Sequence, residues 1–381
     1  MTVRGLYLLP VAMFFGSFAW SFVYVSLPFH VQHISTLDPV STLRWTGWIL
    51  GISSLATVVT APLWGGVAAR GNPIRLYVMV QFLQAICFFA MAAARTLVEL
   101  FLTRFALGVG GAASTFAFVL SGRADDPREV RRQVAAVQSA MTIGQVIGPL
   151  AGAIVAARIG FRPSFIVGGV VLVGCGLLVL WGVSPAPRRE RALAAARPAR
   201  TSEIAAVALI VLGGSSQIFF LPSMLPQVLL ELGVAPQDTL EMGGIVIFVS
   251  GAAAALGALI TGRVSELALE RRLLAALLVI SSAAVAGLAA ARSVWLFGAL
   301  RFLQVLFIAP VFPLVIAGIA PRASGQAIGL LNSARIAAAF VGPVVATTIL
   351  AATSAAAVYL TMAVVGFACV PLVARQRRTI P

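Results

Sequence analysis

The sequence predicts an all-α, polytopic membrane protein whose twelve transmembrane helices form two pseudo-symmetric six-helix bundles, and three observations support this fold class. The composition is 60% hydrophobic and 10% charged, whereas about 25% of residues are charged in an ordinary soluble domain. Apolar runs of the roughly 20 residues that a helix needs to cross a bilayer recur from Leu6 to Val373. In addition, landmarks of the first half of the chain return in the second half.

Charged residues, prolines and glycines separate the apolar runs and set the ends of the predicted helices. The first six predicted spans are residues 6–30, 43–69, 74–94, 97–120, 133–157 and 163–184. The last six are residues 204–230, 242–264, 273–291, 294–320, 325–350 and 354–374. We therefore expect an N-terminal bundle over residues 1–184, a cytoplasmic linker over 185–203, and a C-terminal bundle with a short basic tail over 204–381.

All 27 basic residues are arginine, and the net charge is +15. With both termini in the cytoplasm, nineteen arginines fall in cytoplasmic segments and five in outer ones, which is the asymmetry of the positive-inside rule. This scattering over short loops argues against the single basic face of a nucleic-acid-binding protein. We expect a monomer in the cell inner membrane, surrounded by lipid, with both termini cytoplasmic and no nucleic-acid partner.

The two histidines and three cysteines form no pattern typical of a metal site, a disulfide framework or a catalytic centre. The sequence therefore predicts no cofactor, no metal and no enzymatic activity.

The landmarks of the two halves recur in the same order. Leu27-Pro28 returns as Leu225-Pro226 at an offset of 198 residues, Gly65 as Gly262 and Arg104-Phe105 as Arg301-Phe302 at 197, and Gly148-Pro149 as Gly342-Pro343 at 194. Shared composition explains such an ordered series poorly. A duplication of this kind usually builds a two-domain transporter whose site lies where the two halves meet.

Three arginines, Arg104, Arg301 and Arg335, lie inside predicted spans, where a charge costs a few kcal/mol unless it is paired or faces water. They either face a cavity, or snorkel to the interface and tie helices together through backbone carbonyls. All twelve acids lie in loops or near helix ends on these boundaries. Proton coupling is therefore unsupported, although a coupling ion stays open. Arginines without a fixed counter-charge would favour an anionic or polar substrate.

Polar and aromatic side chains within the spans are candidates for contact with a small-molecule substrate, although each could instead serve ordinary helix packing. The candidate substrate-binding residues are Trp20, Tyr24, Arg104, Gln138, Gln145, Gln217, Phe220, Gln304, Asn332 and Arg335.

Glycine and proline placements indicate close helix packing and movement. Gly144, Gly148 and Gly152 share one helix face at four-residue spacing, which allows a close approach of a second helix. Pro222 and Pro310 are expected to interrupt the seventh and tenth spans. The candidate gating residues are Gly65, Gly66, Arg70, Gly144, Gly148, Pro149, Gly262, Glu266, Gly342 and Pro343.

Three motifs resemble the major facilitator superfamily, and within it the twelve-helix drug:proton antiporter (multidrug efflux) branch. They are GGVAAR at residues 65–70, RFALGVGG at 104–111, and GQVIGPLAG at 144–152 followed by GFRPSF at 160–165. The resemblance implies the major facilitator fold, alternating access by rocking of the two halves, and export. Two features depart from it, because Ala69 stands where the family usually has aspartate and no span carries a mid-membrane carboxylate. The second-half copy of the first motif keeps an acid in Glu266.

Together these observations predict a secondary active transporter that moves a small organic or amphiphilic solute outward across the cytoplasmic membrane. An importer or facilitator of an anionic metabolite is the alternative that the arginine excess favours. A membrane sensor or scaffold that transports nothing is the alternative of another class.

Overall fold

In the computed structural model, which describes residues 3–121, 127–183, 201–264, 271–319 and 325–374, every described element is a helix. Within these residues, twelve segments are long and apolar enough to cross a membrane. This confirms the twelve predicted spans.

The described helices follow one another in two similar series. The first series is α1 (Val3–Phe22), α2 (Ser26–Ile34), α3 (Pro39–Arg70), α4 (Pro73–Ala93), α5 (Leu97–Val109), α6 (Ala113–Ser121), α7 (Pro127–Ile159) and α8 (Phe161–Gly182). The second is α9 (Thr201–Phe219), η1 (Leu221–Met224), α10 (Leu225–Glu231), η2 (Pro236–Asp238), α11 (Thr239–Val264), α12 (Arg271–Gly287), η3 (Leu288–Ala290), α13 (Val294–Ile308), α14 (Val311–Ile319), α15 (Gly325–Ala352) and α16 (Ala355–Ala374).

Four of the spans are interrupted, and each contains two α-helices. They are the first (α1 and α2), the fourth (α5 and α6), the seventh (α9 and α10, joined by η1) and the tenth (α13 and α14). The predicted breaks near Pro222 and Pro310 are confirmed. The breaks in the first and fourth spans were not predicted. The fourth is broken at Gly110 and Gly111, and glycine signals a weak helix less clearly than proline does. The first is broken at residues 23–25, shortly before Pro28. By contrast, α7 is a single helix with Pro149 inside it.

Several helices begin at side chains that accept a hydrogen bond from the first turn. The hydroxyl of Thr96 accepts from the N–H of Glu99 at 3.2 Å, and that of Ser293 accepts from Leu296 at 3.3 Å. These two caps lie 197 residues apart, so both halves start the same helix in the same way. At the start of α3, hydrogen bonds from Ser41 and from the N–H of Val40 hold the pKa of Asp38 below its ordinary value.

The chain divides into two compact units, one of Met1–Thr36 with Ile52–Ala192 and one of Leu37–Gly51 with Leu193–Pro381. Residues 185–200 of the predicted linker lie outside the described residues, and α9 begins at Thr201, three residues before the predicted second bundle. The predicted domain boundary at the linker stays a prediction.

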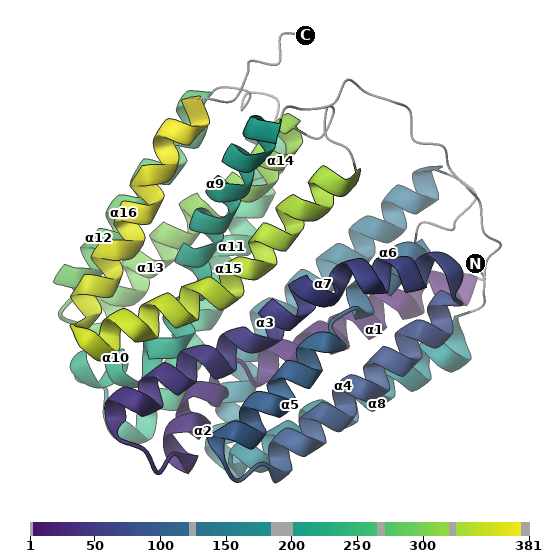
Figure 1. Ribbon diagram of the computed structural model, residues 1–381, viewed down its shortest axis with the longest axis horizontal. Coiled ribbons are helices and arrows are strands. Elements are labelled where there is room, and N and C mark those ends of the chain that lie inside the picture. The colour runs from purple at the N-terminus through teal and green to yellow at the C-terminus, as the bar shows by residue number, and fades with distance from the viewer. Residues whose placement is uncertain (1–2, 122–126, 184–200, 265–270, 320–324, 375–381) are drawn as a thin grey trace. The chain divides into compact units, whose positions relative to one another are not determined.

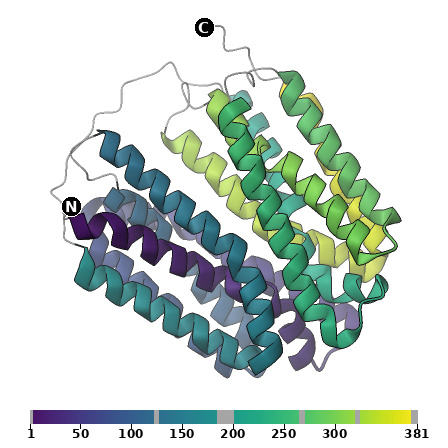
Figure 2. The same cartoon turned by 180° about the vertical axis from the view of Figure 1, so that it is seen from behind.

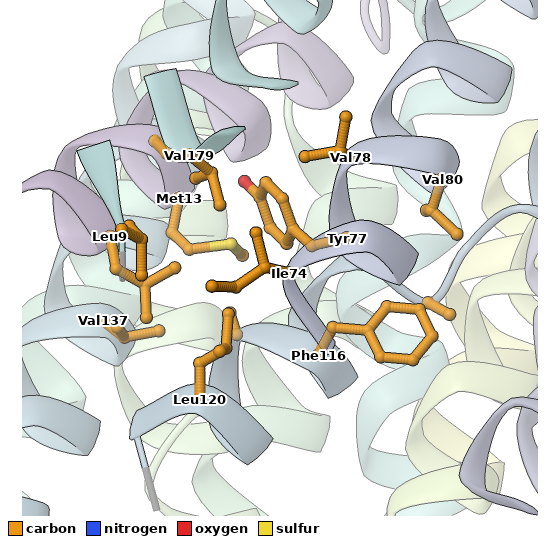
Figure 3. Close-up of a cluster of buried hydrophobic side chains, with 14 of the residues drawn as sticks. Leu9, Met13, Ile74, Tyr77, Val78, Val80, Phe116, Leu120, Val137 and Val179 are labelled. Atoms are coloured by element: carbon orange, nitrogen blue, oxygen red, sulfur yellow. The ribbon is translucent and has the colours of Figure 1, made fainter. Parts of the chain in front are cut away.

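Each unit packs its helices in the same pairs. In the first unit α1 lies against α7 and α4 against α8 (Figure 1). In the second unit α9 lies against α15 and α12 against α16 (Figure 1). Figure 2 shows the helices of each unit from behind. A buried apolar cluster in the first unit joins side chains of six helices around Tyr77 and Phe116 (Figure 3). A second cluster in the second unit gathers around Leu278 and Leu331.

Candidate functional site

Arg301 on α13 is 1% exposed, and protein atoms surround its guanidinium. Its Nη1 donates to the carbonyl oxygen of Gln217 at 2.7 Å and to the side chain of Gln304, and its Nη2 donates to the carbonyl oxygen of Ile218 at 2.6 Å. Its Nε donates to Ser250 Oγ at 3.3 Å, and the guanidinium lies 5.3 Å from the ring centroid of Phe220. The buried charge is therefore fully engaged inside the second unit.

The position of Pro222 explains why an arginine is needed here. In a continuous helix the carbonyl of Ile218 would accept from the N–H of residue 222, but proline has no N–H. An unpaired buried carbonyl costs about 1–3 kcal/mol. Arg301 supplies the missing donor where α9 ends. Of the two roles that the sequence left open, Arg301 has the second, since it ties helices together through backbone carbonyls.

Gln217 joins three helices of the second unit. Its Oε1 accepts from Ser281 Oγ at 3.0 Å, and its Nε2 donates to the carbonyl of Met362 at 2.9 Å. Gln217, Phe220 and Gln304 are each 0% exposed. All three were predicted to contact substrate, and the polar side-chain atoms of the two glutamines are bonded to protein. Their contact with substrate stays a prediction.

A related arrangement occurs in the first unit. Trp20 Nε1 donates to Gln84 Oε1 at 2.9 Å, and this pair precedes the pair Gln217 and Ser281 by 197 residues at both positions. The two units thus place a side-chain hydrogen bond at the same point between their first and third spans. Trp20, predicted to contact substrate, is half-buried and has its N–H engaged.

The break between α5 and α6 is stabilised by donors from neighbouring helices. Three successive carbonyls at this break each accept one side-chain donor: Gly108 from Thr57 at 2.9 Å, Val109 from Trp64 at 2.6 Å, and Gly110 from Gln84 at 2.6 Å. Backbone groups freed from a helix in lipid must find such partners. Thr57 and Trp64 were not among the predicted site residues, although the glycines at 108, 110 and 111 indicate a weak helix whose carbonyls need other donors.

Arg104 on α5 is the counterpart of Arg301 and is likewise buried, at 3% exposure. It lies near Tyr24, a half-buried residue between α1 and α2. Both residues were predicted to contact substrate. Tyr24 keeps some accessible surface for that role, whereas Arg104 keeps almost none.

The predicted close approach through the glycines of α7 is confirmed. A Cβ atom at Gly144, Gly148 or Gly152 would collide with backbone atoms of Phe14, Phe18 or Phe22, respectively. Because the contacts advance by four residues on both helices, α1 and α7 meet along one face over two turns. In the second unit, Gly342 on α15 similarly meets the backbone of Ser216 and Phe220. Pro149 and Pro343 are buried inside α7 and α15.

The remaining predicted gating residues lie toward the end of α3 and its counterpart. Gly65 and Gly66 are exposed with open space around them, and Gly66 borders a shallow groove with Pro62, Leu63, Val67 and Gly71. Arg70 ends α3 and Gly262 lies in α11. Glu266 lies outside the described residues.

Four predicted substrate-binding residues are exposed on membrane-spanning helices. Gln138 and Gln145 lie on α7, and Asn332 and Arg335 on α15. The guanidinium of Arg335 lies 5.3 Å from the ring centroid of Phe312 on α14. Arg335 forms no salt bridge or hydrogen bond with any described residue, in contrast to Arg301.

Comparison with known proteins places this geometry in context. Residues 10–266 match the family model described as Major Facilitator Superfamily. The chain is 25% identical over 351 residues to multidrug resistance protein MdtG of Citrobacter koseri, covering 87% of this chain and 83% of that protein. It is 27% identical over 355 residues to the uncharacterized MFS-type transporter YuxJ of Bacillus subtilis, covering 88% and 87%.

Two solved structures share the fold. A bacterial homologue of the human lysosomal transporter Spinster, inward-facing and occupied, superimposes with a TM-score of 0.77 at 14% identity, covering 99% of this chain and 98% of that one. The human organic anion transporter MFSD10 superimposes with a TM-score of 0.72 at 15% identity, covering 97% and 99%.

Proposed function

Because the chain belongs to the Major Facilitator Superfamily, a family of transporters, we propose that it exports a small organic or amphiphilic solute by alternating access. The proposal includes the cell inner membrane as its location, with both termini in the cytoplasm. The nineteen arginines of the predicted cytoplasmic segments support this orientation.

The observation that carries the proposal is the exposure of polar side chains on spans that should otherwise be apolar. Gln138 and Gln145 are exposed on α7, and Asn332 and Arg335 on α15. Polar and charged groups facing hydrocarbon are costly, so intramembrane ones usually face a bundle interior or a water-filled pathway. We therefore assign these two faces to the solute pathway.

Two considerations support export as the direction. The motif at residues 144–152 resembles that of exporters, and several relatives, among them that of Citrobacter koseri, are named multidrug resistance proteins. Gln138 and Gln145, the two α7 residues assigned to the pathway, are neutral amides, which suit a broad range of amphiphilic solutes because amides can donate and accept hydrogen bonds.

A second candidate function is the import or facilitated diffusion of an anionic metabolite. Arg335 favours it, since this residue is an exposed charge without an acidic partner among the described residues. Every described acid lies in a loop or within a turn of a helix end, including Glu99, Glu129, Glu203 and Glu241. This arrangement gives no support to a mid-membrane carboxylate as a proton carrier.

The test begins with purified full-length protein and a panel of amphiphilic anions, cations and neutral compounds, each scored for thermal stabilisation. Compounds that stabilise the protein are then measured for counterflow in proteoliposomes. Uptake into inside-out membrane vesicles and not into right-side-out vesicles is the result expected of an exporter. The opposite preference would favour the importer. Absence of counterflow for every stabilising compound would overturn transport itself.

A further inference from the structure

We propose that Arg335, Asn332 and the ring of Phe312 form a subsite for the acidic group of an aromatic anion, an inference that rests on the proposed transport function. The class of ligand is a planar aromatic ring that carries a sulfonate, carboxylate or phosphate.

Arg335 lies far from both ends of its helix. It is ten residues from Gly325 and seventeen from Ala352, so its Cα is about 15 Å from one end of α15 and about 25 Å from the other at 1.5 Å per residue. A charge at such a position costs several kcal/mol unless it meets water or a partner. The contact with Phe312 stabilises one face of the guanidinium by about 0.5–2 kcal/mol. It leaves the N–H donors in the guanidinium plane without an acceptor among the described residues.

The neighbouring groups suit an anion. Asn332 is exposed three residues before Arg335, and residues three apart on a helix are neighbours. Its amide can donate to the same acidic group. Phe312 is half-buried and packs against the apolar cluster of the second unit, which fixes the surface under the guanidinium. A guanidinium offers a planar fork for two oxygen atoms and a face on which a ring can stack.

The internal repeat separates this arginine from the structural ones. Arg104 and Arg301 occupy equivalent positions and are both buried, as expected of residues that the fold itself requires. The offset of 194 residues that relates Gly148-Pro149 to Gly342-Pro343 pairs Gln138 with Asn332, but pairs Arg335 with Met141. The amide is present in both halves, whereas the charge is present only in the second. Methionine at the equivalent position shows that the helix pair can be built without an arginine there.

The experiment compares naphthalene-2-sulfonate with naphthalene-2-sulfonamide, which share a ring and differ in charge. Binding to the full-length protein is measured by calorimetry in nanodiscs of phosphatidylcholine. The variants are Arg335→Met, which copies the residue of the other half, and Arg292→Gln, which removes an exposed arginine outside the spans. We expect the wild type and Arg292→Gln to bind the sulfonate at least about tenfold more tightly than the sulfonamide. Arg335→Met should lose that preference and bind the sulfonamide as the wild type does.

Three outcomes would overturn the inference: no preference for the sulfonate in the wild type, an equal loss of both ligands in Arg335→Met, or no binding of either ligand. Counterflow of uncharged compounds would still stand in any of these cases, so failure of this inference is distinct from failure of the transport proposal. Repeating the titration in nanodiscs that contain phosphatidylglycerol tests a lipid phosphate as the occupant. If naphthalene-2-sulfonate no longer binds in those nanodiscs even when it is added in large excess, a lipid phosphate occupies the subsite. That result would refute the proposal that the subsite binds a soluble aromatic anion.

Discussion

The Nη2 atom of Arg301 donates a 2.6 Å hydrogen bond to the carbonyl oxygen of Ile218, which is the carbonyl that Pro222 leaves without its helical donor. A proline on one span and an arginine on another are thus parts of one arrangement. Pro222 interrupts the helix after α9, and Arg301 supplies the donor for the buried carbonyl that this interruption leaves without one.

Replacing Arg301 with methionine should destabilise the protein by about 2–4 kcal/mol, because the carbonyls of Gln217 and Ile218 would both lose a charged donor. Arg301→Lys should fall between the wild type and methionine, since an ammonium cannot reproduce the fork of the guanidinium. The measurement is thermal unfolding of the purified protein in nanodiscs. A midpoint unchanged in Arg301→Met would contradict the structural role.

Pro222→Ala offers a second test of the same arrangement. An alanine restores an N–H that can reach the carbonyl of Ile218, so the loss caused by Arg301→Met should be smaller in the Pro222→Ala background. The double-mutant cycle should give a coupling of about 1 kcal/mol. Simple additivity of the two changes would show that the proline and the arginine are independent.

Gln84 should contribute strongly to stability, because its amide group bonds two other spans. Gln84→Leu leaves the carbonyl of Gly110 and the Nε1 of Trp20 without the partners seen in the structure, which should cost about 2 kcal/mol. Gln145→Leu, on an exposed face of α7, is the matched control and should change stability by less than about 0.5 kcal/mol. Equal effects of the two variants would argue against the bonded network.

Much of the fold could be predicted because it follows from local composition. Twelve apolar runs define twelve spans, and the spacing of the glycines in α7 is sufficient to predict a close helix contact. The site was harder, since a polar residue in a span can face a solute or a neighbouring backbone. Gln217 and Gln304 were predicted to contact substrate, but they are buried among protein acceptors and donors.

The missing information is mostly long-range. Nothing near Trp64 in the sequence indicates that its indole would reach the carbonyl of Val109, 45 residues away. The internal repeat partly supplies what local patterns lack. It matches Trp20 and Gln84 with Gln217 and Ser281 at one offset, and the structure has a hydrogen bond in each pair.

His30 on α2 is a buried residue whose replacement should stabilise the protein. It is 1% exposed, packs 5.3 Å from the ring of Phe161 and 5.2 Å from that of Phe165, and neither ring nitrogen has a hydrogen-bond partner among the described residues. His30→Phe removes two unsatisfied polar atoms from an aromatic site and should stabilise the protein by about 1 kcal/mol. His33→Phe, at an exposed position three residues later, should have little effect. A lower unfolding midpoint for His30→Phe would indicate that a buried water serves the imidazole.

Replacing glycine with alanine should change the stability of the protein in opposite directions at two positions of the first unit. At Gly152 an added methyl group would overlap the carbonyl of Phe22, the last residue of α1, so the backbone there would have to shift. Gly152→Ala should therefore push α7 from α1 and cost about 1–3 kcal/mol. At Gly174 on α8 no atom beyond the adjacent backbone of its own helix lies within 4 Å of the added carbon. Gly174→Ala should therefore gain about 0.5–1 kcal/mol by restricting the unfolded chain. The measurement is thermal unfolding of both variants in the same lipid. A similar loss of stability at both positions would mean that the contact with α1 is not the reason for glycine at position 152.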